Sequence, residues 1–112
     1  MALERGKLSD VVIVAAGSTV GIITVASSKK VYVKSILAHA GTAITSSAQV
    51  YIVPNGGAPI PENKLFDVDI SAGETVMIEP SYPFVIDTTG DSIRVGAGAS
   101  TVNVMITGDK EA

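Results

Sequence analysis

Apolar and polar side chains alternate with a period of two in several short runs of this sequence, and this alternation constrains the fold most strongly. In one run, Phe66, Val68 and Ile70 alternate with Asp67 and Asp69. Successive side chains of a β-strand point to opposite faces, so such a run indicates a strand with one buried face. The same alternation is present at residues 75–79 and 101–107. No stretch has the periodicity expected of a helix.

Turn-forming residues separate the runs. Turns are expected at Gly17-Ser18, Ser27 to Lys30, Gly41 to Ser47, Ser71 to Glu74, Thr88 to Asp91 and Gly96 to Ser100. The links at Ser71 and Thr88 have the glycine placement of short hairpin connections. Turn signals every 8 to 12 residues, roughly, are typical of sandwiches and small barrels. We therefore expect an all-β chain: an antiparallel two-sheet β-sandwich of about eight short strands, with the jelly roll as a candidate arrangement.

The chain length and the distribution of charge suggest one domain with polar ends. A chain of 112 residues is long enough to bury one core. Charged residues gather before Asp10, so residues 1–9 are expected to form a polar N-terminal arm. Residues 10–108 are expected to form the single β-sandwich domain, and residues 109–112 a short polar tail.

The run from Val31 to Ala40 is expected to form a strand with two different faces. Strict alternation places Val31, Val33 and Leu37 on one face and Tyr32, Lys34 and Ile36 on the other. His39 is in phase with the first set and is therefore expected at the rim of the core. The chain has one histidine and no cysteine, which leaves few nucleophile–base combinations. We expect no catalytic residues, no cofactor and no enzymatic activity.

Two pairs of carboxylates were weighed as calcium ligands. Asp67 and Asp69 share one face of a strand, and Asp87 and Asp91 flank a turn. Two carboxylates are too few for a calcium site, and neither pair has the EF-hand spacing. Gly96-Ala97-Gly98 lacks the following helix of a dinucleotide-binding loop and is expected to form a turn. No metal or cofactor site is predicted.

The balance of charge bears on possible partners. Eight basic and eleven acidic residues give a formal net charge of −3, which does not favour a nucleic-acid partner. Residues 11–28 are uncharged, and their number alone would admit a short membrane helix. The run is interrupted by Gly17-Ser18-Thr19 and is rich in β-branched residues, so two strands fit better and no membrane partner is expected.

Composition favours contact between subunits. Hydrophobic residues make up 46% of the chain and charged residues only 17%. The runs Val11 to Ala16 and Ile22 to Ala26 are almost wholly apolar, which suggests burial on both faces or contact with another subunit. The alternative is a monomer whose apolar excess consists mostly of small residues. Interface candidates are Leu3, Arg5, Lys7, Val12, Val14, Ile22 and Tyr82.

One long loop is a further candidate for recognition. The loop from Asn55 to Asn63 is stiffened by Pro59 and Pro61, and neither proline can donate to a sheet. Such a loop on a rigid scaffold can carry binding specificity.

Several segments resemble small β-sandwich proteins of tailed bacteriophage virions. They are Val-Tyr-Val-Lys-Ser-Ile from Val31, Val-Tyr-Ile-Val-Pro-Asn-Gly-Gly from Val50, Ile-Ser-Ala-Gly-Glu-Thr-Val from Ile70, Pro-Phe-Val-Ile-Asp from Pro83 and Gly-Asp-Ser-Ile-Arg-Val from Gly90. The resemblance extends from roughly Val20 to Thr107.

This resemblance implies a non-enzymatic virion structural protein. The implied role is a capsid decoration (cement) protein that braces neighbouring capsomers from the capsid exterior after synthesis in the host cytoplasm. Its implied partners are further copies of itself, with a trimer favoured, and the major capsid protein. The alternative is a tail-, neck- or baseplate-associated binding domain that recognises a receptor or glycan. The resemblance carries no catalytic residues.

Overall fold

The computed structural model describes residues 3–26, 29–41 and 45–111, which form ten strands and one short 3-10 turn. The strands are β1 (Leu3–Lys7), β2 (Val12–Val14), β3 (Thr19–Thr24), β4 (Val31–Ala40), β5 (Ser46–Val53), β6 (Lys64–Ile70), β7 (Thr75–Ile78), β8 (Phe84–Ile86), β9 (Ser92–Ala97) and β10 (Val102–Glu111), and the 3-10 turn is η1 (Pro61–Asn63). In this part of the chain no helix has the length and apolar character needed to cross a membrane.

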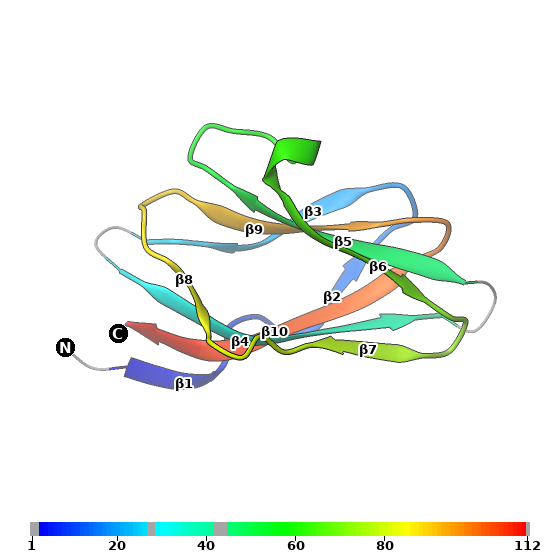
Figure 1. Ribbon diagram of the computed structural model, residues 1–112, viewed down its shortest axis with the longest axis horizontal. Coiled ribbons are helices and arrows are strands. Elements are labelled where there is room, and N and C mark those ends of the chain that lie inside the picture. The colour runs from blue at the N-terminus through cyan, green and yellow to red at the C-terminus, as the bar shows by residue number, and fades with distance from the viewer. Residues whose placement is uncertain (1–2, 27–28, 42–44, 112) are drawn as a thin grey trace.

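The strands form two antiparallel sheets that pack face to face (Figure 1). The six-stranded sheet has the order β1-β10-β4-β7, with β2 also paired to β10 and β8 also paired to β4. The four-stranded sheet has the order β3-β9-β5-β6. The prediction of an all-β antiparallel two-sheet architecture is confirmed, with ten strands in place of about eight.

The core lies between the sheets and is built from the predicted alternation. Val102, Val104 and Ile106 of β10 and Ile70 of β6 each have 0% exposed surface. Phe66 and Val68 pack against the same core. Because successive side chains alternate between faces, the intervening residues of these strands point outward.

Two predicted turns form, but they join the sheets to each other. The Glu74 amide donates to the Ser71 carbonyl at 2.9 Å, and the Asp91 amide donates to the Thr88 carbonyl at 3.0 Å. The first turn leads from β6 in the four-stranded sheet to β7 in the six-stranded sheet. The second leads from β8 back to β9. The prediction that they are hairpin links is therefore wrong.

A β-bulge in β4 overturns the predicted phase of that strand. Thr107 pairs with Ser35 and Gly108 pairs with Val33, which leaves Lys34 as an extra residue. An extra residue reverses the alternation beyond it. The buried residues of β4 are accordingly Val31, Val33, Ile36, Ala38 and Ala40. Leu37 and His39 lie on the outer face, and their predicted places on the face of Val31 and Val33 are wrong.

The described residues nearest the two termini lie within the six-stranded sheet. β1 pairs antiparallel with β10, from Leu3 opposite Glu111 to Lys7 opposite Thr107. The expected polar arm (residues 1–9) and polar tail (residues 109–112) are thus largely strand, although Met1, Ala2 and Ala112 lie outside the described residues. Charged residues are compatible with this placement because an edge strand has solvent beside it.

Candidate functional site

Half of the outer face of the six-stranded sheet carries uncharged side chains. One row across the strands contains Ile13, Asn103, His39 and Thr75, and a second contains Met105, Leu37 and Met77. Directly paired residues of an antiparallel sheet share a face. Val11 joins these residues along the same groove. We call this set the uncharged patch: Val11, Ile13, Leu37, His39, Thr75, Met77, Asn103 and Met105.

The uncharged patch is accessible and slightly hollowed. The exposed fractions of Ile13, Val11 and Met77 are 68%, 63% and 55%. A groove of about 280 Å³ runs between Val11, Leu37, His39 and Met105. Single exposed apolar residues are normal, but a contiguous group on one face is typical of an interaction surface.

His39 is held in the patch by a neutral partner. Its Nδ1 lies 2.9 Å from Oγ1 of Thr75, the residue opposite it on β7. Within the described ranges no three or more histidine, cysteine or acidic side chains gather as a metal site would require. The geometry around His39 is that of a polar contact on an otherwise apolar surface.

The outer face of the four-stranded sheet is polar by contrast. The Gln49 amide group donates to Oδ1 of Asp67 at 3.2 Å, and Nζ of Lys64 lies 3.3 Å from Oδ2 of the same residue. The hydrogen bond from Gln49 is the main reason that the pKa of Asp67 is below its usual range, and Lys64 adds to the effect. Ion pairs and hydrogen bonds between exposed charged groups contribute little to stability, because water competes for the same groups. This face therefore has the character of a surface in contact with solvent.

The six-stranded sheet carries charged side chains in two places, beyond the bulge and along the edge formed by β1. Nζ of Lys34 lies 3.0 Å from Oδ2 of Asp109, a residue with 6% exposed surface. At the edge of the sheet, Nζ of Lys7 lies 2.7 Å from Oδ1 of Asp10. This exposed hydrogen-bonded pair raises the pKa of Lys7 and lowers the pKa of Asp10. These charged side chains thus border the uncharged patch on two sides, beyond the bulge and at the β1 edge.

The structure does not bring the predicted interface residues together. Val14 is fully buried and has no surface to offer a partner, and Val12 is partly buried. Tyr82 is 87% exposed between β7 and β8. Leu3 and Arg5 lie in β1, but their side chains are outside the description, and Lys7 pairs with Asp10.

Sequence reasoning missed most of the uncharged patch. Strict alternation puts Leu37 on the face of Val31 and Val33, because periodicity alone does not reveal the bulge at Lys34. The alternation at residues 101–107 places Met105 on the face opposite the buried one, and a methionine at such an outward position is a signal for an apolar surface. Ile13 was included in an apolar run without a distinction between its two faces.

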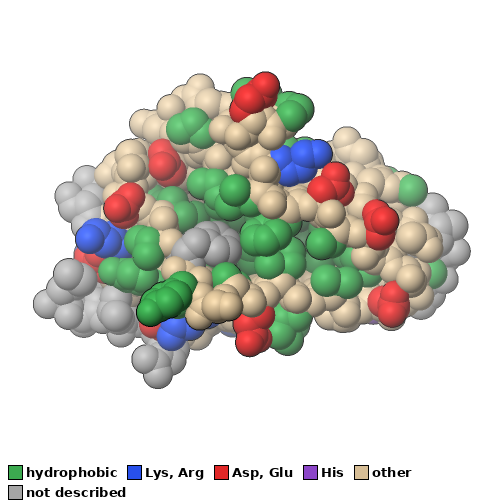
Figure 2. Space-filling view, in the orientation of Figure 1, with side chains coloured by type: hydrophobic (Ala, Val, Ile, Leu, Met, Phe, Trp, Pro, Cys, Tyr) green, Lys and Arg blue, Asp and Glu red, His purple; other side chains and the backbone are tan. Residues whose placement is uncertain are grey.

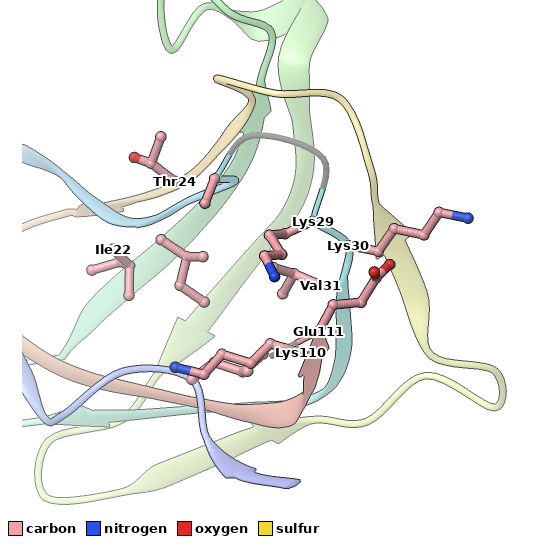
Figure 3. A pocket seen from close by; sticks show the side chains of 10 residues that line it. Ile22, Thr24, Lys29, Lys30, Val31, Lys110 and Glu111 are labelled. Atoms are coloured by element: carbon pink, nitrogen blue, oxygen red, sulfur yellow. The ribbon is translucent and has the colours of Figure 1, made fainter. Parts of the chain in front are cut away.

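A second concave feature lies at the end of the sandwich that holds the chain termini. This cleft of about 390 Å³ is lined by Leu8, Ile22, Ile23, Thr24, Ala26, Lys29, Lys30, Val31, Lys110 and Glu111. Figure 3 shows the side chains of Ile22, Lys29, Val31 and Lys110 around it, with Lys29 beside Val31 and Lys110 below Ile22 in this view. Ile22, predicted as an interface residue, is thus part of its wall.

No protein-family model and no curated protein matches the sequence. Several solved structures share the fold. A chain from the T13 particle of infectious bursal disease virus has a TM-score of 0.55 at 8% identity, and a chain from the Gx strain of that virus has 0.51 at 11% identity. A Bacillus endospore appendage, a disulfide-linked pilus, has 0.52 at 12% identity.

The match covers 97% of this chain in all three cases. The chain spans 30% and 31% of the two virus chains, and 90% of the pilus chain. Identities this low establish a common fold and no more. The chain is therefore a two-sheet all-β domain of a type found in virus particles and in a pilus.

Proposed function

We propose that this chain is a non-enzymatic structural protein of a bacteriophage virion, and that it acts as a capsid decoration (cement) protein. The observation that carries the proposal is the uncharged patch, a contiguous surface on one sheet in which five of the eight side chains are apolar. The fold that the chain shares with virus-particle chains supports a virion role. The resemblance of its hairpin segments to phage sandwich proteins supports the phage and the decoration role.

The strand connectivity supports the jelly roll as the form of sandwich. Strands distant in sequence are neighbours in both sheets, as in β10 beside β4 and β9 between β3 and β5. The chain passes repeatedly from one sheet to the other. Two interlocked Greek keys have this interleaving, and virus capsid domains commonly use it.

The mechanism would be passive bracing. The patch covers four strands about 4.8 Å apart and two rows of residues, which gives an area on the order of 250 Å². A stable interface needs about 800 Å² on each partner. One patch therefore binds weakly, and the combined effect of many copies would stabilise the capsid. The partners would be the major capsid protein and further copies of this chain, arranged as trimers on the capsid exterior after synthesis in the host cytoplasm.

Imaging of intact particles tests this role. Electron microscopy of virions with and without the protein is expected to show added density on the outer capsid surface. Particles without it are expected to lose integrity at lower temperature. Density at the tail alone would refute the capsid role.

The rigid loop after β5 favours a second candidate, a tail-, neck- or baseplate-associated domain that binds a receptor or glycan. The Asn63 side-chain amide donates to the Ala58 carbonyl at 2.8 Å, and the Gly57 amide donates to the Pro54 carbonyl at 2.8 Å. A glycan array and a cell-binding assay separate the candidates, since a decoration protein is expected to give no specific signal in either.

A further inference from the structure

The lysine-lined cleft and the exposed turn around η1 are complementary in charge and in apolar character. We propose that the cleft of one copy receives Ile60 and Glu62 of a second copy. This contact rests on the proposed function in one respect, namely that copies of this chain associate with one another. It is separate from the uncharged patch and would join different surfaces of two subunits.

The cleft has an apolar floor and a basic rim. Ile22, Ile23 and Leu8 form apolar wall, while Lys29, Lys30 and Lys110 outnumber Glu111. The rim thus has an excess of positive charge on a chain whose formal net charge is −3. Its volume of about 390 Å³ is within the usual range of binding pockets, about 300–1,000 Å³. An occupant that carries an aliphatic group and a carboxylate would match this cleft. The aliphatic group would contact the apolar wall, and the carboxylate would lie near the lysines.

The side chains in the cleft are placed to hold such a group. Lys110 comes from the end of β10 and Lys29 from the segment before β4, and both side chains border the cleft in Figure 3. Both lysines therefore line the same cleft as the apolar side chains of Ile22 and Val31. A carboxylate near them is attracted more strongly than in bulk water because the neighbouring groups are apolar.

The turn presents the complementary group. Ile60 lies between Pro59 and Pro61 and is 45% exposed, and Glu62 is exposed in η1. In the described part of the chain Glu62 has no ion-pair partner. Figure 2 shows an acidic side chain next to hydrophobic ones at the top of the molecule, over this turn. The turn therefore carries an aliphatic side chain and a carboxylate two residues apart.

The turn is rigid before any contact is made. The Ile60 amide donates to the Ala58 carbonyl at 2.9 Å, and the Asn63 amide donates to the Ile60 carbonyl at 2.9 Å. The prolines on either side of Ile60 restrict the backbone further. A preorganised segment loses little conformational entropy on binding, which favours contact through a small area.

The location of the two features determines the type of assembly. In Figure 1 the turn lies beside the four-stranded sheet, whereas the cleft lies at the end of the sandwich that holds the chain termini. A contact between unlike surfaces is heterologous and yields a closed ring or an open array. Three such contacts that close on themselves would give the favoured trimer.

A charge exchange tests the contact. Sedimentation of the full chain over a range of concentrations is expected to show about tenfold weaker self-association for Glu62→Lys and for Lys110→Glu, because each places like charges together. The double variant restores a pair of opposite charges. Its self-association is expected to be within about threefold of that of the wild-type chain. Glu79→Lys makes the same charge change at an exposed residue outside both surfaces and is expected to have little effect.

Several outcomes would overturn the proposal. They are a wild-type chain that stays monomeric at high concentration, single variants that associate normally, and a double variant as weak as the single variants. Circular dichroism and thermal unfolding verify that each variant is folded. Decanoate, an aliphatic carboxylate, serves as a small-molecule probe of the cleft. If decanoate binds near Lys110 while the variants associate normally, the cleft is a small-molecule site and the subunit contact is wrong.

The charge exchange and the imaging of virions test separate proposals, so either proposal can be overturned without the other. A failed exchange with the protein on the capsid exterior would overturn this contact alone. A successful exchange with the protein at the tail would overturn the capsid role alone.

Discussion

Gly108 permits the close approach of β4 and β10 at the bulge. A Cβ atom at this position would collide with the Tyr32 carbonyl oxygen and lie 3.1 Å from the Lys34 amide nitrogen. Both neighbours are backbone atoms and cannot rotate away. We expect Gly108→Ala to lower the free energy of unfolding by about 2–4 kcal/mol, as measured by urea denaturation. Gly21→Ala in β3 is the control, because a Cβ there meets nothing within 4 Å; equal losses in the two variants would contradict this account.

Lys34 provides a charged partner for a carboxylate that is almost completely buried. Lys34→Met keeps most of the aliphatic stem but removes the ammonium group 3.0 Å from Oδ2 of Asp109. We expect a loss of about 1–3 kcal/mol in stability at neutral pH, because a buried charge loses a partner. The control is Lys7→Met, whose ion pair with Asp10 is exposed and is expected to contribute little. A Lys34→Met variant as stable as the control would argue against this role for the ion pair.

At the scale of elements, β1 protects the edge of β10. Leu3–Lys7 pairs with residues 107–111, while Leu8 and Ser9 make their own contacts with Ile106. Deletion of residues 1–7 is expected to lower stability by about 2 kcal/mol, since several hydrogen bonds of about 1 kcal/mol are exchanged for bonds to water.

Hydrogen exchange provides the readout for this deletion. The amides of residues 107–111 are expected to exchange faster in the shortened chain, and those of residues 102–104, which pair with β2, are expected to change less. The shortened chain is also expected to aggregate more readily because an edge becomes unpaired. Unchanged exchange would mean that residues 1–7 act as a dispensable arm.

At the scale of the whole molecule, the two outer faces differ in the partners they suit. Met105 lies in the uncharged patch and points away from the core, so Met105→Glu is expected to leave stability almost unchanged. We expect it to weaken binding to capsids that lack the protein by about tenfold or more, because a charge would be buried without a partner. Cosedimentation with such capsids measures the effect.

The matched control is Thr19→Glu on the outer face of the four-stranded sheet, where Thr19 is exposed opposite Gly96. This variant adds the same charge to a face that is expected to meet solvent. Capsid binding that falls equally in both variants would indicate a general effect of charge, and the uncharged patch would then have no special role.

Local patterns in the sequence are sufficient to predict the class of fold. Alternation at Phe66 to Ile70 and at Val102 to Ile106 predicted strands with one buried face, and these residues line the core. The turns at Ser71 and Thr88 also formed where they were expected. These features depend on residues adjacent in the chain, because strand alternation and turn geometry are properties of local backbone.

The pairing of the strands, and the surfaces that result from this pairing, depend on contacts between distant parts of the chain. The bulge at Lys34 follows from the pairing of β4 with β10, strands about 70 residues apart, and it moves Leu37 and His39 to the outer face. The uncharged patch and the lysine cleft each combine side chains from distant strands. Periodicity contains no information about which strands become neighbours, because that choice depends on the packing of the whole core.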